Sequence, residues 1–319
     1  MIEMAEFLHY GVIVATVAIT VIGVGIGGGI ASQGAIAAIN TQPSARSYVT
    51  RIAVLGMALL DTAAILGIVV AIILFRNNTI PHAYPTSIAE LGIAFAICLP
   101  GFVIGLVSSF PVYTACLSVA RQPFLSQKIL RFMLITQTLI QTPIIFGFII
   151  ALFINIQAAG VTTVAEGIQL MASGLCMGLG SIGPAIGMAQ FAKTACRGIG
   201  INRNAYSRIL TFTFLSEAII ETPIIFSLLI AGLIITSPIA SHDPLLTSIA
   251  FISAALATGL GTMGPGISSG KIASASCKEI THNPELYGTL SRASLFGTSL
   301  IDTCAIYALL ISIMLIVWI

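Results

Sequence analysis

Charged side chains are scarce in this 319-residue chain: Asp, Glu, Lys and Arg together make up 8% of it, and the formal net charge is +2. A nucleic-acid-binding surface is therefore not expected, because such surfaces carry basic clusters with interleaved aromatic residues. Hydrophobic residues make up 57% of the chain, more than the core of a water-soluble domain could hide. These proportions exclude soluble enzymes and secreted disulfide scaffolds, and they indicate an integral membrane protein surrounded by lipid.

Sequence signatures of metal, redox or nucleotide chemistry are also missing. No GxxxxGK[ST] phosphate-binding loop occurs, so we expect a non-catalytic chain without a cofactor. The N-terminus has no positively charged stretch before its apolar run, so we expect that run to stay as a helix. The cysteines lie in apolar segments without CxxC spacing, which predicts small core residues rather than metal ligands or disulfides. They are Cys98, Cys116, Cys176, Cys196, Cys277 and Cys304.

Long apolar runs dominate what is present. Stretches such as LGIVVAIILF are apolar on every side, whereas a transmembrane β-strand would alternate apolar and polar residues. With a spanning length of about 20 residues, the sequence predicts an all-α membrane protein with eight transmembrane helices. The runs cover roughly 8–39, 48–75, 88–120, 129–157, 166–196, 209–236, 246–277 and 290–319.

The basic residues are distributed unevenly along these runs. Of the 13 Lys and Arg residues, all but Arg76 flank alternate connections between the predicted helices. Positive charge accumulates on the cytoplasmic side of membrane proteins, so we expect these connections to be cytoplasmic. Both termini are then expected on the non-cytoplasmic side.

The sequence repeats itself with a period of 80 or 81 residues. The related segments are LDTAAIL at 60–66, IQTPIIF at 140–146, IETPIIF at 220–226 and IDTCAIY at 301–307. Each repeat contains two predicted helices, so all repeats enter the membrane in the same direction, unlike the inverted repeats of many transporters. We predict four tandem helical hairpins, numbered 1 to 4, at 1–80, 81–160, 161–240 and 241–319. A single hairpin has no core of its own, so we expect the hairpins to pack side by side.

The first helix of a hairpin carries small residues at two-residue spacing. On a helix this spacing produces two narrow small faces on nearly opposite sides, which lets neighbouring helices approach closely from both directions. A tight ring of equivalent helices requires this property. The positions are Gly23, Gly25, Gly27 and Gly29; Gly183, Ala185, Gly187 and Ala189; and Gly264, Gly266, Ser268 and Gly270.

The second helix of each hairpin carries one polar residue at the same aligned position: Asp61, Gln141, Glu221 or Asp302. An ionised side chain at the bilayer centre costs at least about 2.5–3.5 kcal/mol. These helices contain no Lys or Arg at matching depth, so we expect the acids to bind a proton or a cation. Gln141 cannot ionise, which predicts that hairpin 2 carries no ion.

Two further features accompany these positions. A threonine follows each of them, and its hydroxyl could either serve the ion or hydrogen-bond to the preceding helical turn. Glu217 precedes Glu221 by one turn and shares its helix face. Two carboxyls this close cannot both ionise cheaply, so at least one is expected to hold a proton or share a cation. The aligned residue in hairpin 2 is Gln137, which cannot ionise.

A glycine-rich first helix, a polar Gln-Pro loop and a second helix with a central acid together resemble the membrane rotor proteolipid, or c subunit, of rotary ATP synthases. The resemblance covers essentially the whole chain, four times over. It implies a homo-oligomeric ring in membrane lipid whose acids bind H⁺ or Na⁺ and are discharged by an arginine of the stator, in its a subunit. It also implies that the polar loops contact the central stalk, and it suggests a bacterial inner membrane.

Carried over residue by residue, the resemblance assigns ion binding to Asp61, Glu221 and Asp302, with support from Thr62, Thr222, Thr303 and Glu217. It assigns contact with the central stalk to the cytoplasmic loops. The loop residues are Gln42, Pro43, Arg121, Gln122, Pro123, Asn202, Asn283 and Pro284.

The identity of the ion and the direction of the machine stay open. Pro184, Pro265 and the hydroxyl residue after the acid match sodium-binding members, whereas Met188 and Ser269 replace their inner-helix glutamine. Multi-hairpin fusions with a lost acid are more typical of V-type proton pumps, so an ATP-driven ion pump is the alternative. A secondary transporter, which requires helices interrupted at the midplane, and a passive structural proteolipid are more distant rivals.

Overall fold

The computed structural model describes residues 2–76, 83–239 and 243–318, and all of the regular structure in these ranges is helical. Short 3₁₀ turns connect some of the helices: η1 (Pro43–Ala45), η3 (Pro123–Leu125), η4 (Arg203–Ala205) and η5 (Pro284–Leu286). The α-helices are α1 (Ile2–Thr41), α2 (Arg46–Arg76), α3 (Tyr84–Val107), α4 (Ser109–Arg121), α5 (Ser126–Ile140), α6 (Thr142–Ala158), α7 (Val164–Ile201), α8 (Tyr206–Thr236), α9 (Pro244–Gly261), α10 (Met263–His282) and α11 (Tyr287–Val317).

The described residues form eight membrane spans of 34 to 39 residues, which confirms the predicted all-α membrane fold. Three spans are divided by single-residue turns at Ser108, Gln141 and Thr262, but each continues as one span. The turn at Gln141 lies two residues before Pro143, whose ring removes a backbone donor and clashes with the preceding turn. In hairpin 3, by contrast, α8 continues through Pro223 without a break.

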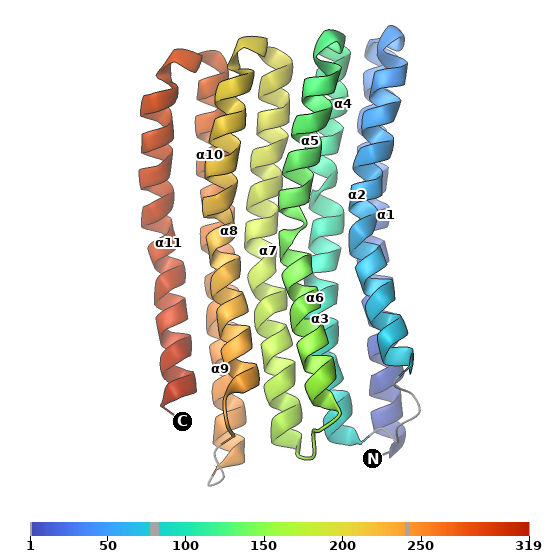
Figure 1. Ribbon diagram of the computed structural model, residues 1–319, viewed down its shortest axis with the longest axis vertical. Coiled ribbons are helices and arrows are strands. Elements are labelled where there is room, and N and C mark those ends of the chain that lie inside the picture. Colours follow the sequence, from blue (N-terminus) through green and yellow to red (C-terminus); the bar gives the residue numbers. More distant parts are fainter. Residues whose placement is uncertain (1, 77–82, 240–242, 319) are drawn as a thin grey trace.

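The spans are arranged in two layers. The first-helix layer contains α1, α3–α4, α7 and α9–α10, each in contact with the next. The second-helix layer contains α2, α5–α6, α8 and α11, which also follow one another in chain order. Figure 1 shows the chain ends at one end of the bundle and the connections built on the η turns at the other. The predicted hairpin boundaries at 80 and 240 lie outside the described residues.

Small residues bring the first-helix layer into backbone contact. A Cβ atom on Gly23 or Gly27 would collide with the backbone of α3, and one on Gly187 would collide with the carbonyl oxygen of Gly266 in α10. One predicted small face of α1 is therefore in use. A Cβ on Gly25 or Gly29 would have nothing within 4 Å, so the other small face of α1 is open.

The opposite end of the row is open as well, because a Cβ on Gly264 would also have nothing within 4 Å. The first-helix layer thus ends in an uncovered small residue on each side. Five of the six cysteines are buried, as predicted, whereas Cys304 is exposed. The prediction of a core role for Cys304 was wrong because this residue lies on a face of α11 that no described helix covers.

Candidate ion-binding site

The three predicted acids lie at equivalent places in the second-helix layer. Asp61, Glu221 and Asp302 are each the middle residue of a 31-residue helix. With a rise of 1.5 Å per residue, each carboxyl is about 22 Å along the helix from either helix end. A hydrocarbon core of about 30 Å centred on these helices therefore places all three acids near its midplane.

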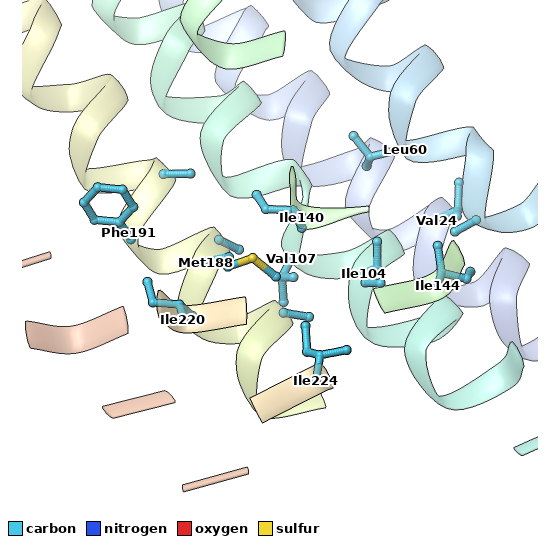
Figure 2. Packing of buried hydrophobic residues seen from close by; sticks show 14 of the residues in the cluster. Val24, Leu60, Ile104, Val107, Ile140, Ile144, Met188, Phe191, Ile220 and Ile224 are labelled. Carbon is cyan, nitrogen blue, oxygen red and sulfur yellow. The ribbon is translucent and has the colours of Figure 1, made fainter. Parts of the chain in front are cut away.

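In hairpins 1 to 3, the residue before the polar position fixes the direction in which the polar side chain points. Leu60, Ile140 and Ile220 are at most 1% exposed, and Figure 2 shows them in the packing between the layers. Consecutive helical residues are turned by about 100°, so the following residue faces sideways, toward the border between neighbouring hairpins. Burial of the apolar residue therefore directs the acidic side chain away from the core.

The surroundings of the acids differ from hairpin to hairpin. Asp61 is exposed, whereas Glu221 and Asp302 are partly covered by neighbouring helices. The Ser269 hydroxyl donates to Oδ1 of Asp302 at 3.5 Å, so the serine that replaces an inner-helix glutamine still contacts the acid. The Thr142 hydroxyl lies within hydrogen-bonding reach of the Glu221 carboxylate. The site in hairpin 3 therefore includes a side chain from hairpin 2.

The threonines that follow the acids use their hydroxyl protons within their own helices. Thr62 donates to the Leu59 carbonyl at 2.7 Å and Thr303 to the Leu300 carbonyl at 2.7 Å. Thr222 donates to the carbonyl of the residue four positions earlier, Ala218, at 3.3 Å. Of the two roles that the sequence left open, the structure therefore shows the bond to the preceding turn. Each hydroxyl oxygen keeps its lone pairs, which could still serve a cation.

The glutamines of hairpin 2 form hydrogen bonds where hairpin 3 has acids. Gln141 is 5% exposed, and its Nε2 donates to the Leu59 carbonyl of α2 at 3.0 Å. Gln137 Nε2 donates to the Gly56 carbonyl at 3.1 Å and to the Ser108 carbonyl at 3.2 Å. Both amides fasten hairpin 2 to hairpin 1, a role that the repeat pattern does not predict.

Glu217 has no such bonds. It is 1% exposed, and neither carboxylate oxygen has a hydrogen-bond partner among the described residues. It also lies close enough to Glu221 to interact with it electrostatically. An ionised carboxylate that is buried without a partner is strongly unfavourable.

The predicted stalk-contact residues gather at one end of the bundle, at or beside the η turns. Two of them also link neighbouring hairpins: Gln122 Nε2 donates to the Gly200 carbonyl at 3.1 Å, and Asn202 Nδ2 donates to the Thr281 carbonyl at 2.8 Å. Gln42, at the start of the row, instead donates to the Ser44 hydroxyl at 2.9 Å. The links between hairpins were not predicted, because the sequence does not show which loop faces which neighbour.

A buried pair near the other end was missed entirely. His9 Nδ1 and Glu90 Oε2 are 2.8 Å apart, with both side chains at most 4% exposed, and they join α1 to α3. Neither residue has an equivalent at the aligned position of another hairpin, so the repeat gave no signal for this contact.

Comparison with known proteins agrees with this geometry. The family model for the C subunit of ATP synthase matches residues 171–234 and 252–315, within hairpins 3 and 4. The chain is 41% identical over 64 residues to ATP synthase c subunit 2 of Cereibacter sphaeroides, covering 20% of this chain and 77% of the relative. It is 41% identical over 69 residues to the ATP synthase c subunit of Chloroflexus aurantiacus, covering 22% of this chain and 91% of the relative. This chain belongs to the ATP synthase c-subunit family.

A third relative shows how the chain differs from other members of the family. The ATP synthase c subunit of Dehalococcoides mccartyi is 42% identical over 71 residues, which cover 93% of the relative but 22% of this chain. A nearly complete relative thus matches about one hairpin of the present protein. The chain is an F-type rotor proteolipid in which several such units are fused, and it is a membrane rotor component of ATP synthase.

Proposed function

We propose that several copies of this chain close a ring that carries H⁺ or Na⁺ through the membrane as it turns in an F-type ATP synthase. The observation that supports this most is the placement of Asp61, Glu221 and Asp302 at the midpoints of three helices of one layer. Exposing an ionised carboxyl to lipid at this depth costs several kcal/mol. Each acid therefore stays neutral, protonated or sodium-bound, while it faces lipid.

Ion exchange takes place where the ring meets the stator. A stator arginine stabilises the ionised acid, and water-filled half-channels let the ion leave on one side of the membrane and enter on the other. The loops at the η turns contact the central stalk, and the nucleotide chemistry lies on other polypeptides of the synthase. We place the chain in a bacterial inner membrane with both termini on the non-cytoplasmic side.

Ring closure would complete the site of Asp61. The hydroxyl that reaches Glu221 comes from the preceding hairpin, through Thr142. No described hairpin precedes hairpin 1, so in the proposed ring the aligned hydroxyl for Asp61 is Thr303 of a second copy. The uncovered Gly25 and Gly264 at the two ends of the first-helix layer support such head-to-tail contact.

Hairpin 2 contributes no ion, because Gln141 is neutral and donates to Leu59. A full turn then moves three ions for every four hairpins. Each ion that crosses 100 mV supplies about 2.3 kcal/mol, so fewer ions per ATP make synthesis harder. Gln141 thereby favours the alternative function, in which the complex hydrolyses ATP to pump ions.

Glu217 belongs to the site of hairpin 3 as a second carboxyl. We assign it a proton or cation shared with Glu221, because the two carboxyls interact and no described donor reaches Glu217. When Glu221 is ionised, a protonated Glu217 one turn away can donate to it. Glu217 then acts as a supporting residue, and Glu221 exchanges the ion.

Carbodiimide modification tests this function, because the reagent reacts readily with protonated carboxyls in apolar surroundings. The purified full-length chain is treated in detergent over a range of pH, with and without Na⁺, and modified peptides are identified by mass. We expect modification at Asp61, Glu221 and Asp302, with Na⁺ slowing it in a sodium rotor and leaving it unchanged in a proton rotor. The absence of modification at all three acids would falsify the proposed ion-carrying function.

A further inference from the structure

A basic cavity lies between α7 and α10, near the end of the bundle that carries η4. Its volume is about 370 Å³. Four of its eight described lining residues have basic side chains, and none of the eight is Asp or Glu. The basic residues are Lys193, Arg197, Lys278 and His282.

The charges in this cavity are not neutralised by the protein. Among the described residues, none of its lysines or arginines forms an ion pair with a carboxylate. Lys193 Nζ lies 5.4 Å from the ring centroid of Phe110, an interaction that leaves its positive charge in place. A cavity with three permanent cations and no acidic group attracts an anion.

Backbone carbonyls at the helix ends do not explain the basic residues either. Cations commonly stabilise the last carbonyls of a helix. Here the carbonyl of Gly198 accepts from the backbone N–H of Asn202 at 3.0 Å, and that of Thr281 accepts from Asn202 Nδ2 at 2.8 Å. These carbonyls beside the cavity already have partners, so the cations remain available to a ligand.

Nor does the general accumulation of positive charge at this end of the bundle account for the cavity. Lys193 and Arg197 align with Tyr113 and Leu117 in hairpin 2 and with Gln33 and Ala37 in hairpin 1. The other hairpin borders thus lack the basic pair, even though the same loops carry basic residues elsewhere. The cavity is particular to the border between hairpins 3 and 4.

The depth of the cavity indicates what kind of anion fits. The 38 residues of α7 make it about 57 Å long, so a centred hydrocarbon core of about 30 Å leaves about 13 Å of helix beyond each edge. Lys193 is about 12 Å from the helix end at Ile201, at the hydrocarbon edge, and Arg197 is about 6 Å farther out. The cavity therefore spans the layer of phospholipid headgroups.

We propose that this cavity binds the phosphate group of an anionic phospholipid. Arg197 and Lys278 contact the phosphate, while Lys193 lies at the boundary where the acyl chains begin. A lipid delivers its phosphate at this depth with its chains already in the hydrocarbon layer. Basic pockets between transmembrane helices on the cytoplasmic side bind anionic headgroups in this way.

Lipid binding to the full-length chain in detergent tests the proposal. Native mass spectrometry measures retained lipid during titrations with phosphatidylglycerol and with phosphatidylcholine of the same acyl chains. We expect phosphatidylglycerol to bind and phosphatidylcholine to bind much more weakly. At about 1 kcal/mol per basic residue, the double variant R197Q/K278Q should bind phosphatidylglycerol about 25-fold more weakly.

The matched control is R46Q/R131Q, which removes the same charge from exposed residues that do not line the cavity. It should bind phosphatidylglycerol as the unmodified chain does. Equal weakening in both double variants, or unchanged binding in R197Q/K278Q, would overturn the proposal. Displacement of the lipid by an equal concentration of inorganic phosphate would also overturn it, in favour of a free phosphate site. None of these outcomes depends on whether the acids carry ions.

Discussion

Close packing of α7 against α10 makes the size of the residue at position 187 critical. In G187A, the new methyl group would collide with the carbonyl oxygen of Gly266 and lie 3.1 Å from its carbonyl carbon. It would also lie 3.2 Å from Cγ2 of Ile220. Carbon contacts are most favourable at about 3.5–4.0 Å, so the helices must separate by about 0.5–1 Å. We expect a loss of about 1–3 kcal/mol in unfolding free energy, as for other overpacked cores.

The assay is unfolding of the detergent-solubilised chain in increasing sodium dodecyl sulfate, followed by circular dichroism. The matched control is G25A, which adds the same methyl group to α1 where nothing lies within 4 Å. The single chain should tolerate G25A, whereas association between copies should weaken if α1 packs against another chain. Size-exclusion chromatography with light scattering measures that association.

Two results would contradict this reasoning. Equal losses of unfolding free energy in G187A and G25A would mean that backbone contact between α7 and α10 does not set stability. Unchanged association of G25A would mean that the open small face of α1 is not a contact between copies.

Three further predictions concern polar side chains. Q141E should add a fourth carbodiimide-reactive carboxyl and raise the ion stoichiometry, while removing the donor to the Leu59 carbonyl. Mass mapping of modified peptides measures the first effect, and ion counting in liposomes measures the second. Unchanged numbers of reactive carboxyls and transported ions would contradict the silent role of hairpin 2. N202A removes the hydrogen bond to the Thr281 carbonyl and should lower the unfolding free energy by about 0.5–1.5 kcal/mol in the same detergent assay. An unchanged unfolding free energy would show that this link is not stabilising. E217Q reproduces the natural glutamine of hairpin 2, so it should fold and should shift the pH profile of ion exchange; an unchanged profile would limit Glu217 to a structural role.

The sequence was sufficient for those features that depend on one helix at a time. Apolar runs and the 80-residue period predicted the spans, because hydropathy and repetition are properties of the chain itself. The midpoint placement of Asp61 follows from the same pattern. Contacts between hairpins were not predictable in this way. The position of Thr142 beside Glu221 depends on which neighbour each side chain faces, which follows from the direction of packing.

Predictions from the sequence also failed at the two ends of the row of hairpins. The small residues of α1 predicted two equivalent faces, but Gly27 is packed while Gly25 is uncovered, because no described helix packs on that second face. Cys304 was assigned to the core because it lies in an apolar run, but no described helix covers its face of α11. A repeat predicts what a unit with a neighbour on each side contacts, and it does not predict which faces the described helices leave uncovered.

The covalent fusion of hairpins has a consequence for the motion of the ring. In a ring built only from copies of these four hairpins, the number of hairpins would be a multiple of four. Because Gln141 stands between Asp61 and Glu221, the interval between these two acids is twice the interval between Glu221 and Asp302. The rotor would advance in unequal rotational steps between successive acids, with one long step and two short steps for each chain. Elastic twisting of the stalk would have to drive the ring through each long step. The torque would therefore pulse once for every chain in the ring.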